Sequence, residues 1–345
     1  SEAFWSRHKG RFQRREAEGR IRECHGDLRC EHVYLQPGPQ VIDCIEFDLN
    51  LRCGDVAADL GFLLMDMDRH GAEGPARELL RAYAARAGDP GIYGLIDFYK
   101  CYRAMVRVKV NCLQLAAGGL GMHAALRLKS DTESLLASAY DYARRLNRPL
   151  LFVTSGLPAS GKSTLAKALA AVLDLPVQRS DEVRKALFKL PPRESRVDAY
   201  QRGIYTPAAT VRTYARLLQQ AHRHLRRGGG LVLDATYNRR SHRRGLLELA
   251  RQTRSGLVLI HCTCPRQILK ERLGARQRRS SDGQVSDARL THLEALKKAF
   301  EPLDDLPPEI VVPVATDRPV AENLLTILAH AHGRPWRNTV IPRDA

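Results

Sequence analysis

The stretch Gly156–Thr164 reads GLPASGKST and decides the fold of the second half of the chain. It satisfies the pattern G-x-x-x-x-G-K-[ST], with the apolar run PLLFVTSG before it and the helical pattern KSTLAKALAAVLD after it. The glycines allow backbone N–H groups to close around phosphates, and the N-terminus of the helix adds its positive end. The pattern therefore predicts a phosphate-binding loop between a strand and a helix, with ATP and Mg²⁺ as cofactors.

Individual residues of this loop and its surroundings have distinct expected roles. Lys162 is expected to reach the β- and γ-phosphates, and Ser163 to bind Mg²⁺. Asp234 ends the apolar run GLVLDAT, where a carboxylate can face the metal or the attacking hydroxyl; capping of the next helix is the alternative role. The residues expected to contact the nucleotide are Gly156, Leu157, Pro158, Ala159, Ser160, Gly161, Lys162, Ser163 and Thr164.

A second pair of charged residues follows the next expected strand, in RSDEVRK. Asp181 and Arg184 are three residues apart, a spacing that places both side chains on one face at the start of a helix. The carboxylate can accept the proton of a substrate hydroxyl, and the guanidinium can bind phosphate. The alternative is an aspartate that caps the helix beside a solvated arginine.

Arginines cluster again in KERLGARQRRSSDGQVSDA, after the fourth expected strand. Such side chains can close over ATP and neutralise the charge of the transition state. Not all of them can act in this way, and the spacing does not select among them. The arginines concerned are Arg272, Arg276, Arg278 and Arg279.

The pattern of the whole chain predicts an α/β protein of two domains. Residues 1–147 read as mainly helical after one short β-hairpin, HVYLQPGPQVIDCIEF. The boundary falls near LNRP, where a helical pattern gives way to an apolar strand. Residues 148–335 alternate between strands and helices, which predicts a doubly wound parallel sheet, and 336–345 form a C-terminal tail.

At the motifs GLPASGKST, RSDEVRK and VLDATYNRR, and at the arginine-rich segment after them, the chain resembles the small P-loop kinases of the AAA_33 type. That group is similar to gluconate kinase, polynucleotide 5′-kinase and the zeta toxins, and the resemblance covers about residues 149–335. It implies that Asp181 is the carboxylate on the substrate side, with Arg184 as its partner. It also implies that Arg272 and Arg276 belong to the lid.

A second resemblance lies in the first domain, where HGDLRCEHVYL, VIDCIEF and GDVAADLGFL occur in the order found in aminoglycoside phosphotransferase-like kinases. The resemblance implies that Asp27 orients or deprotonates the acceptor and that Asp43 binds the metal. It also implies that Asp55 and Asp59 are mainly structural.

Two departures from that family separate the first domain from a complete kinase. His32 stands where the family has a metal-binding Asn, and Mg²⁺ prefers oxygen ligands. Twenty-four residues precede His25, where the family has an N-terminal lobe, so we expect a C-lobe without its N-lobe. The whole chain resembles bacterial bifunctional aminoglycoside phosphotransferase and ATP-binding proteins without their first lobe.

The amino-acid composition narrows the range of partners that the chain is expected to bind. The formal net charge of +17 favours nucleotides, phosphorylated metabolites or nucleic acid, although it also fits arginines spread over solvated faces. The eight cysteines form no CxxC pair, and no apolar run is long enough to span a membrane, which favours a reducing cytoplasm. We expect an ATP-dependent phosphotransferase acting on a hydroxyl of a small molecule such as a sugar. The alternatives are a nucleic-acid 5′-hydroxyl kinase and a non-catalytic regulatory module.

Overall fold

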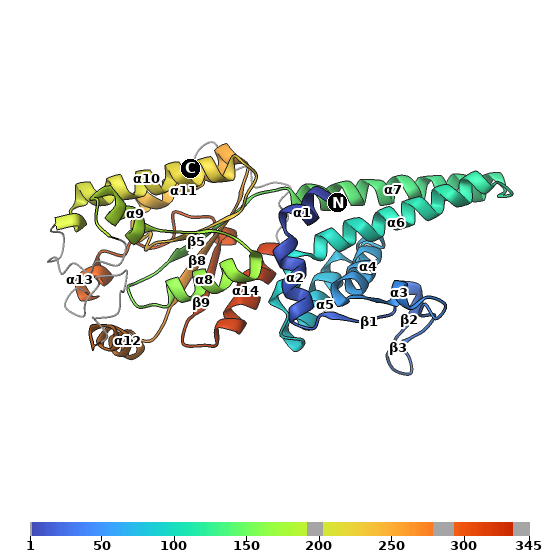
Figure 1. Ribbon diagram of the computed structural model, residues 1–345, viewed down its shortest axis with the longest axis horizontal. Helices are drawn as coiled ribbons and strands as arrows, with labels where there is room; N and C mark the ends of the chain where they lie inside the picture. Colours follow the sequence, from blue (N-terminus) through green and yellow to red (C-terminus); the bar gives the residue numbers. More distant parts are fainter. Residues whose placement is uncertain (1, 192–202, 279–292, 334–345) are drawn as a thin grey trace. The chain divides into compact units, whose positions relative to one another are not determined.

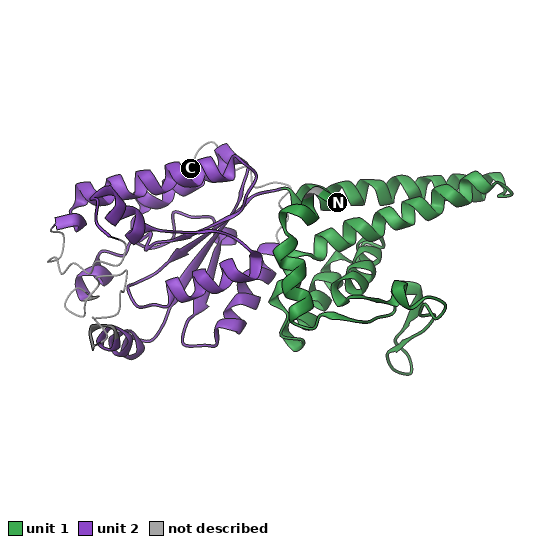
Figure 2. Cartoon of the chain, in the orientation of Figure 1, with its two compact units in different colours: residues 1–147 green, residues 148–345 purple. Residues whose placement is uncertain are grey.

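A computed structural model describes residues 2–191, 203–278 and 293–333 of the chain. The chain separates into two compact units, residues 1–147 and 148–345 (Figure 2). In the described parts of the chain, no helix has both the length and the apolar character needed to cross a bilayer.

The second unit is built on a five-stranded parallel sheet of order β6-β7-β5-β8-β9 (Figure 1). Its strands are β5 (Leu150–Ser155), β6 (Val177–Arg179), β7 (Leu231–Asp234), β8 (Gly256–Thr263) and β9 (Val311–Ala315). Its helices are α8 (Lys162–Leu173), α9 (Ser180–Leu187), α10 (Pro207–Leu225), α11 (Arg240–Thr253), α12 (Arg266–Arg278), α13 (Leu293–Lys298) and α14 (Val320–Gly333). The expected doubly wound fold is confirmed.

The central strands are apolar on both sides because helices cover both faces of the sheet. Leu151 and Val153 of β5 belong to the core formed with α10 and α11, while Phe152 between them is equally buried on the opposite face. The helices α8 and α14 cover that opposite face (Figure 1). This continuous burial explains the unbroken apolar runs in the sequence.

The first unit is mainly helical. Its helices are α1 (Glu2–Arg7), α2 (Lys9–Ala17), α3 (Leu49–Arg52), α4 (Val56–Arg69), α5 (Glu73–Arg86), α6 (Ile96–Ala117) and α7 (Met122–Leu146). The core between α4, α6 and α7 contains Phe62, Met65, Ala104, Leu135 and Tyr142. Helices α1 and α2 precede the expected hairpin and were not foreseen from the sequence.

Two small antiparallel pairs complete the first unit. The expected hairpin is present as β2 (Val33–Tyr34) and β3 (Gln40–Val41). The other pair joins β1 (Ile21–Glu23) to β4 (Cys53–Asp55), and it brings the segment before HGD against the start of α4. The single-turn helix η1 (Cys30–His32) begins shortly after the HGD segment, with Arg29 as its N-cap residue.

Candidate functional sites

The loop at Gly156–Thr164 connects β5 to α8, and its backbone takes conformations that ordinary residues avoid. Gly156, Ala159 and Gly161 have φ angles of 141°, 61° and 80°. A Cβ atom on Gly156 would collide with the carbonyl oxygen of Cys262, and one on Gly161 would lie 2.9 Å from Cβ of Thr316. Glycine is therefore required at both positions by conformation and by space.

The side chain of Lys162 contacts the backbone of the loop that precedes it. Lys162 is the first residue of α8, is buried, and donates a hydrogen bond of 2.6 Å from Nζ to the carbonyl oxygen of Leu157. Ser160 Oγ is also buried and has no hydrogen-bond partner among the described residues. Buried polar atoms ordinarily have partners, so a hydroxyl in this state fits a loop that receives oxygen-rich phosphate groups.

A pocket of about 410 Å³ lies beside the loop. Arg272 of α12 closes one side: its guanidinium donates to the carbonyl oxygen of Thr316 at 2.7 Å and to Thr316 Oγ1 at 3.2 Å. A longer contact of 3.5 Å joins it to the carbonyl oxygen of Ala159. The pocket is lined by Ala159, Gly161, Thr164, Leu165, Arg272, Ala275, Thr316, Arg318, Val320 and Asn323.

Asp234 occupies the carboxyl end of β7, between β5 and β6. It is 6% exposed, accepts a hydrogen bond of 3.3 Å from Thr154 Oγ1, and pairs with Arg179 Nε at 3.1 Å. Arg179 is the last residue of β6 and lies directly opposite Asp234 in the ladder. Arg179 was not singled out from the sequence, although the short strand that it ends was expected.

Asp181 and Arg184, the pair expected on the substrate side, both lie on α9, and their side chains have different surroundings. Asp181 is in the first turn of the helix and half-buried. Arg184 is 6% exposed and donates to the carbonyl oxygen of Ile204 at 3.0 Å and to Thr210 Oγ1 at 3.2 Å. The described contacts of Arg184 thus tie α9 to the start of α10, and its Nε atom is buried without a partner among the described residues.

Three further arginines were candidates for the lid: Arg276, Arg278 and Arg279. Arg276 and Arg278 belong to α12, but their side chains lie outside the described residues, as does all of Arg279. Of the four arginines in this group, Arg272 is the one whose side-chain contacts the structure describes.

The ligand atoms available around Asp234 would suit a cation. Its carboxylate already faces the guanidinium of Arg179, which occupies the place of a positive ion. Ser163 and Asp234 both offer oxygen, the ligand type that Mg²⁺ prefers. Among the residues that the structure describes, no group of three or more His, Cys, Asp or Glu residues could hold a metal by itself. Ser163 and Asp234 would thus supply protein oxygen ligands for Mg²⁺, and nucleotide phosphates would add further ones.

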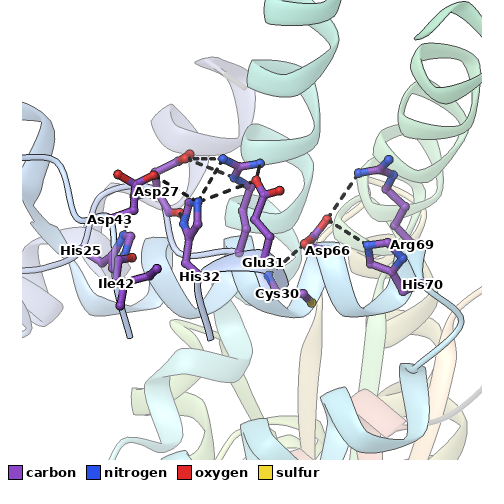
Figure 3. Close-up of polar contacts among 11 residues, drawn as sticks. His25, Asp27, Cys30, Glu31, His32, Ile42, Asp43, Asp66, Arg69 and His70 are labelled. Carbon is purple, nitrogen blue, oxygen red and sulfur yellow. Dashed lines mark hydrogen bonds and ion pairs between the residues drawn. The ribbon is translucent and has the colours of Figure 1, made fainter. Parts of the chain in front are cut away.

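In the first unit, the HGD segment forms a compact polar cluster (Figure 3). The backbone N–H groups of His25 and Gly26 donate to the two carboxylate oxygens of Asp59, at 2.6 Å and 2.9 Å. Asp59 lies in the first turn of α4 and therefore fixes the loop that carries Asp27. The structure gives Asp59 the anchoring contacts that a structural carboxylate would make.

The carboxylate of Asp27 is paired with a residue that the sequence did not single out. Arg29 donates to Asp27 Oδ2 from Nε at 3.1 Å and from NH2 at 2.9 Å, and also pairs with Glu31. His32 Nδ1 lies 2.8 Å from the carbonyl oxygen of Asp27, so this nitrogen carries the proton. His32 Nε2 lies 3.5 Å from Asp43 Oδ2. Figure 3 shows both side chains.

Comparison with protein families identifies the two parts of the chain. Residues 151–303 match the model of the AAA domain family AAA_33, and residues 2–99 match the phosphotransferase enzyme family, APH. The chain therefore joins an APH-type segment to an AAA_33-type P-loop domain, as the sequence motifs predicted.

Curated relatives are similar to a long segment of the chain. Uncharacterized proteins of Mycobacterium bovis and Mycobacterium tuberculosis are 32% identical over 272 residues, which is 79% of this chain and 53% of theirs. The chain thus spans about half the length of the curated relatives it matches.

Solved structures of low sequence identity are also similar to part of the chain. A gluconokinase from Sinorhizobium meliloti is 21% identical and covers 53% of this chain and 91% of its own, with a TM-score of 0.37. An APS kinase from M. tuberculosis, solved with AMPPNP and APS, is 19% identical over 53% of this chain and 97% of its own, with a TM-score of 0.39.

Proposed function

We propose that the second unit transfers the γ-phosphoryl group of ATP to a hydroxyl of a small molecule, such as a sugar. The observation that carries the proposal is the loop Gly156–Thr164. Its glycine conformations are those of a phosphate cradle, and the pocket beside it has room for the remainder of a nucleotide.

The expected chemistry divides between the two ends of the site. Asp181 accepts the proton of the acceptor hydroxyl while the oxygen of that hydroxyl attacks the γ-phosphorus. The bond between that phosphorus and the β–γ bridging oxygen breaks, and ADP leaves. The Nζ atom of Lys162 exchanges its hydrogen bond with the carbonyl oxygen of Leu157 for hydrogen bonds with phosphate oxygens. Arg272 holds the pocket closed through its contact with Thr316. Mg²⁺, held by Ser163 and Asp234, would neutralise charge on the phosphates.

An ATP-consumption screen of the full chain tests the proposal. Sugars, sugar acids, aminoglycosides and 5′-hydroxyl oligonucleotides are offered with Mg²⁺, and formation of phosphorylated product is followed. Lys162→Met is expected to abolish transfer. Lys167→Met is the matched control, because Lys167 lies on the same helix and is exposed. Equal turnover of the Lys162 variant and the parent chain would exclude the site.

A nucleic-acid 5′-hydroxyl is the second candidate acceptor, favoured by the net charge of +17. Binding to phosphate backbones releases counterions, so affinity for an oligonucleotide should fall steeply with salt. Binding that is undetectable at low salt would remove this candidate. A third candidate is a regulatory role for the second unit. ATP binding and slow hydrolysis, with no phosphorylated product across the panel, would support it.

The first unit is not assigned the catalytic step in this proposal. Its Asp27 carboxylate is paired with Arg29, and His32 occupies the position of a metal-binding Asn. The proposal also places the protein in the cytoplasm, where ATP and reduced cysteines are available.

A further inference from the structure

The carboxylate of Asp234 has a donor on each oxygen. Thr154 Oγ1 lies 3.3 Å from Oδ1, and Arg179 Nε lies 3.1 Å from Oδ2. The three residues come from neighbouring strands and are paired across the ladders β5–β7 and β6–β7. The arrangement therefore follows from the register of the sheet and does not require a flexible loop.

Arg179 also contacts the helix that carries the substrate-side carboxylate. It is the N-cap residue of α9, and its NH1 atom lies 3.3 Å from Glu182 Oε1 in the first turn of that helix. Asp181 is the neighbour of Glu182. A single guanidinium therefore connects the metal-side carboxylate Asp234 to the helix of Asp181.

The burial of the two contacts differs. The side chains of Arg179 and Asp234 are 14% and 5% exposed, whereas that of Glu182 is 45% exposed. Charge pairs weaken as solvent reaches them. The contact with Asp234 is consequently the stronger hold on Arg179, and the contact with Glu182 is the weaker one.

We propose that Arg179 is a positioning residue that occupies Asp234 until a divalent cation binds there. This inference rests on the proposed function and adds a regulatory step to the same site. A cation that binds Asp234 Oδ2 competes with the guanidinium for that oxygen and repels its charge. Arg179 then leaves Asp234 and remains near Glu182, so cation binding is transmitted to the start of α9 and to Asp181.

Manganese affinity tests the inference without any turnover. Free Mn²⁺ is measured by electron paramagnetic resonance with the full chain, in the absence of nucleotide and acceptor. Arg179→Met keeps the bulk of the side chain and removes its charge. We expect Mn²⁺ to bind this variant about tenfold more tightly than the parent chain, because a competing unit charge has gone.

Two further variants show whether the effect belongs to Asp234. Glu182→Gln removes the exposed partner of Arg179 and is expected to leave Mn²⁺ affinity within about twofold of the parent value. Adding Asp234→Asn to Arg179→Met is expected to abolish the gain. An unchanged or weaker Mn²⁺ affinity in Arg179→Met, or a gain that survives Asp234→Asn, overturns the inference.

A loss of folding does not leave the inference untested. Circular dichroism identifies variants that unfold, and Arg179→Lys then replaces Arg179→Met. Lysine keeps the charge but lacks the Nε–H donor that reaches Asp234, so a gain in Mn²⁺ affinity smaller than about tenfold is expected; no gain overturns the inference. The outcome is also separable from the proposed function: a chain without phosphotransferase activity can still show the Mn²⁺ gain, and an active kinase can lack it.

Discussion

Arg15 binds Asp55 through two parallel hydrogen bonds, from Nε to Oδ2 at 2.5 Å and from NH2 to Oδ1 at 2.7 Å. Arg15 is 2% exposed and also pairs with the fully buried Asp89. Asp55 additionally accepts the backbone N–H of Ala57 and so caps α4. The buried guanidinium thus joins α2 to the start of α4 and to the turn that follows α5.

Removing this guanidinium should unfold the first unit at lower denaturant concentration. Arg15→Met leaves two buried carboxylates without their cation, and we expect a loss of about 3–5 kcal/mol in the free energy of unfolding. Urea unfolding followed by circular dichroism measures the change. Arg81→Met is the control, because Arg81 pairs with Glu78 on the exposed face of α5. Equal unfolding midpoints for the two variants would contradict the prediction.

Gly156→Ala should disable the phosphate loop. The added Cβ meets the carbonyl oxygen of Cys262, and the φ angle of 141° is strained for alanine. We expect a destabilisation of about 1–3 kcal/mol and a loss of nucleotide binding, measured by calorimetric titration with ATP. Gly74→Ala is the matched control, since a Cβ at Gly74 in α5 meets nothing within 4 Å. Normal ATP affinity in Gly156→Ala would show that the loop does not hold phosphate.

The fold of the second unit was predictable because its signals are local. Strand β5 is buried on both faces and reads as an apolar run, and the loop after it needs glycine at Gly156 and Gly161 for conformational reasons. Helix α8 follows at once. Each of these features is fixed by residues that are neighbours in the sequence.

Pairings between distant residues were not predictable. Arg15 and Asp55 are 40 residues apart, and Arg179 and Asp234 are 55 apart. No periodicity distinguishes these arginines from the solvated ones in a chain of net charge +17. The inward position of Arg184 was hidden for the same reason, because its partners Ile204 and Thr210 lie beyond the end of α9.

Arg272→Met should weaken nucleotide binding more than the transfer step. Its guanidinium holds the carbonyl oxygen of Thr316 and lines the pocket beside the loop. We expect KM for ATP to rise about tenfold, because the variant loses a charge-assisted hydrogen bond at the wall of the pocket. Arg266→Met is the control on the same helix, because Arg266 is exposed and pairs with Glu294. A fall in kcat at constant KM would instead assign Arg272 to the transition state.

His242 should make the stability of the second unit depend on pH. Its ring stacks on Tyr214 at 3.9 Å. Burial, and then the charge of Arg239, lower the pKa of His242 from 6.5 to about 4. Between about pH 6.5 and about pH 4, His242 is protonated in the unfolded chain and neutral in the folded chain. The free energy of unfolding should therefore fall as pH decreases from about 6.5 to about 4, and level off below that.

Urea midpoints of the parent chain and of histidine variants, measured at pH 7 and pH 5, separate the contribution of His242 from that of other titratable groups. His242→Gln keeps a polar side chain that cannot titrate, so its midpoint should fall less on acidification than that of the parent chain. His70→Gln is the control, because His70 lies at the exposed end of α4 in the other unit and should leave the acid-induced fall unchanged. If His242→Gln and the parent chain lose the same stability between the two pH values, His242 is protonated equally in the folded and unfolded states, and its burial against Tyr214 does not govern the acid sensitivity of the second unit.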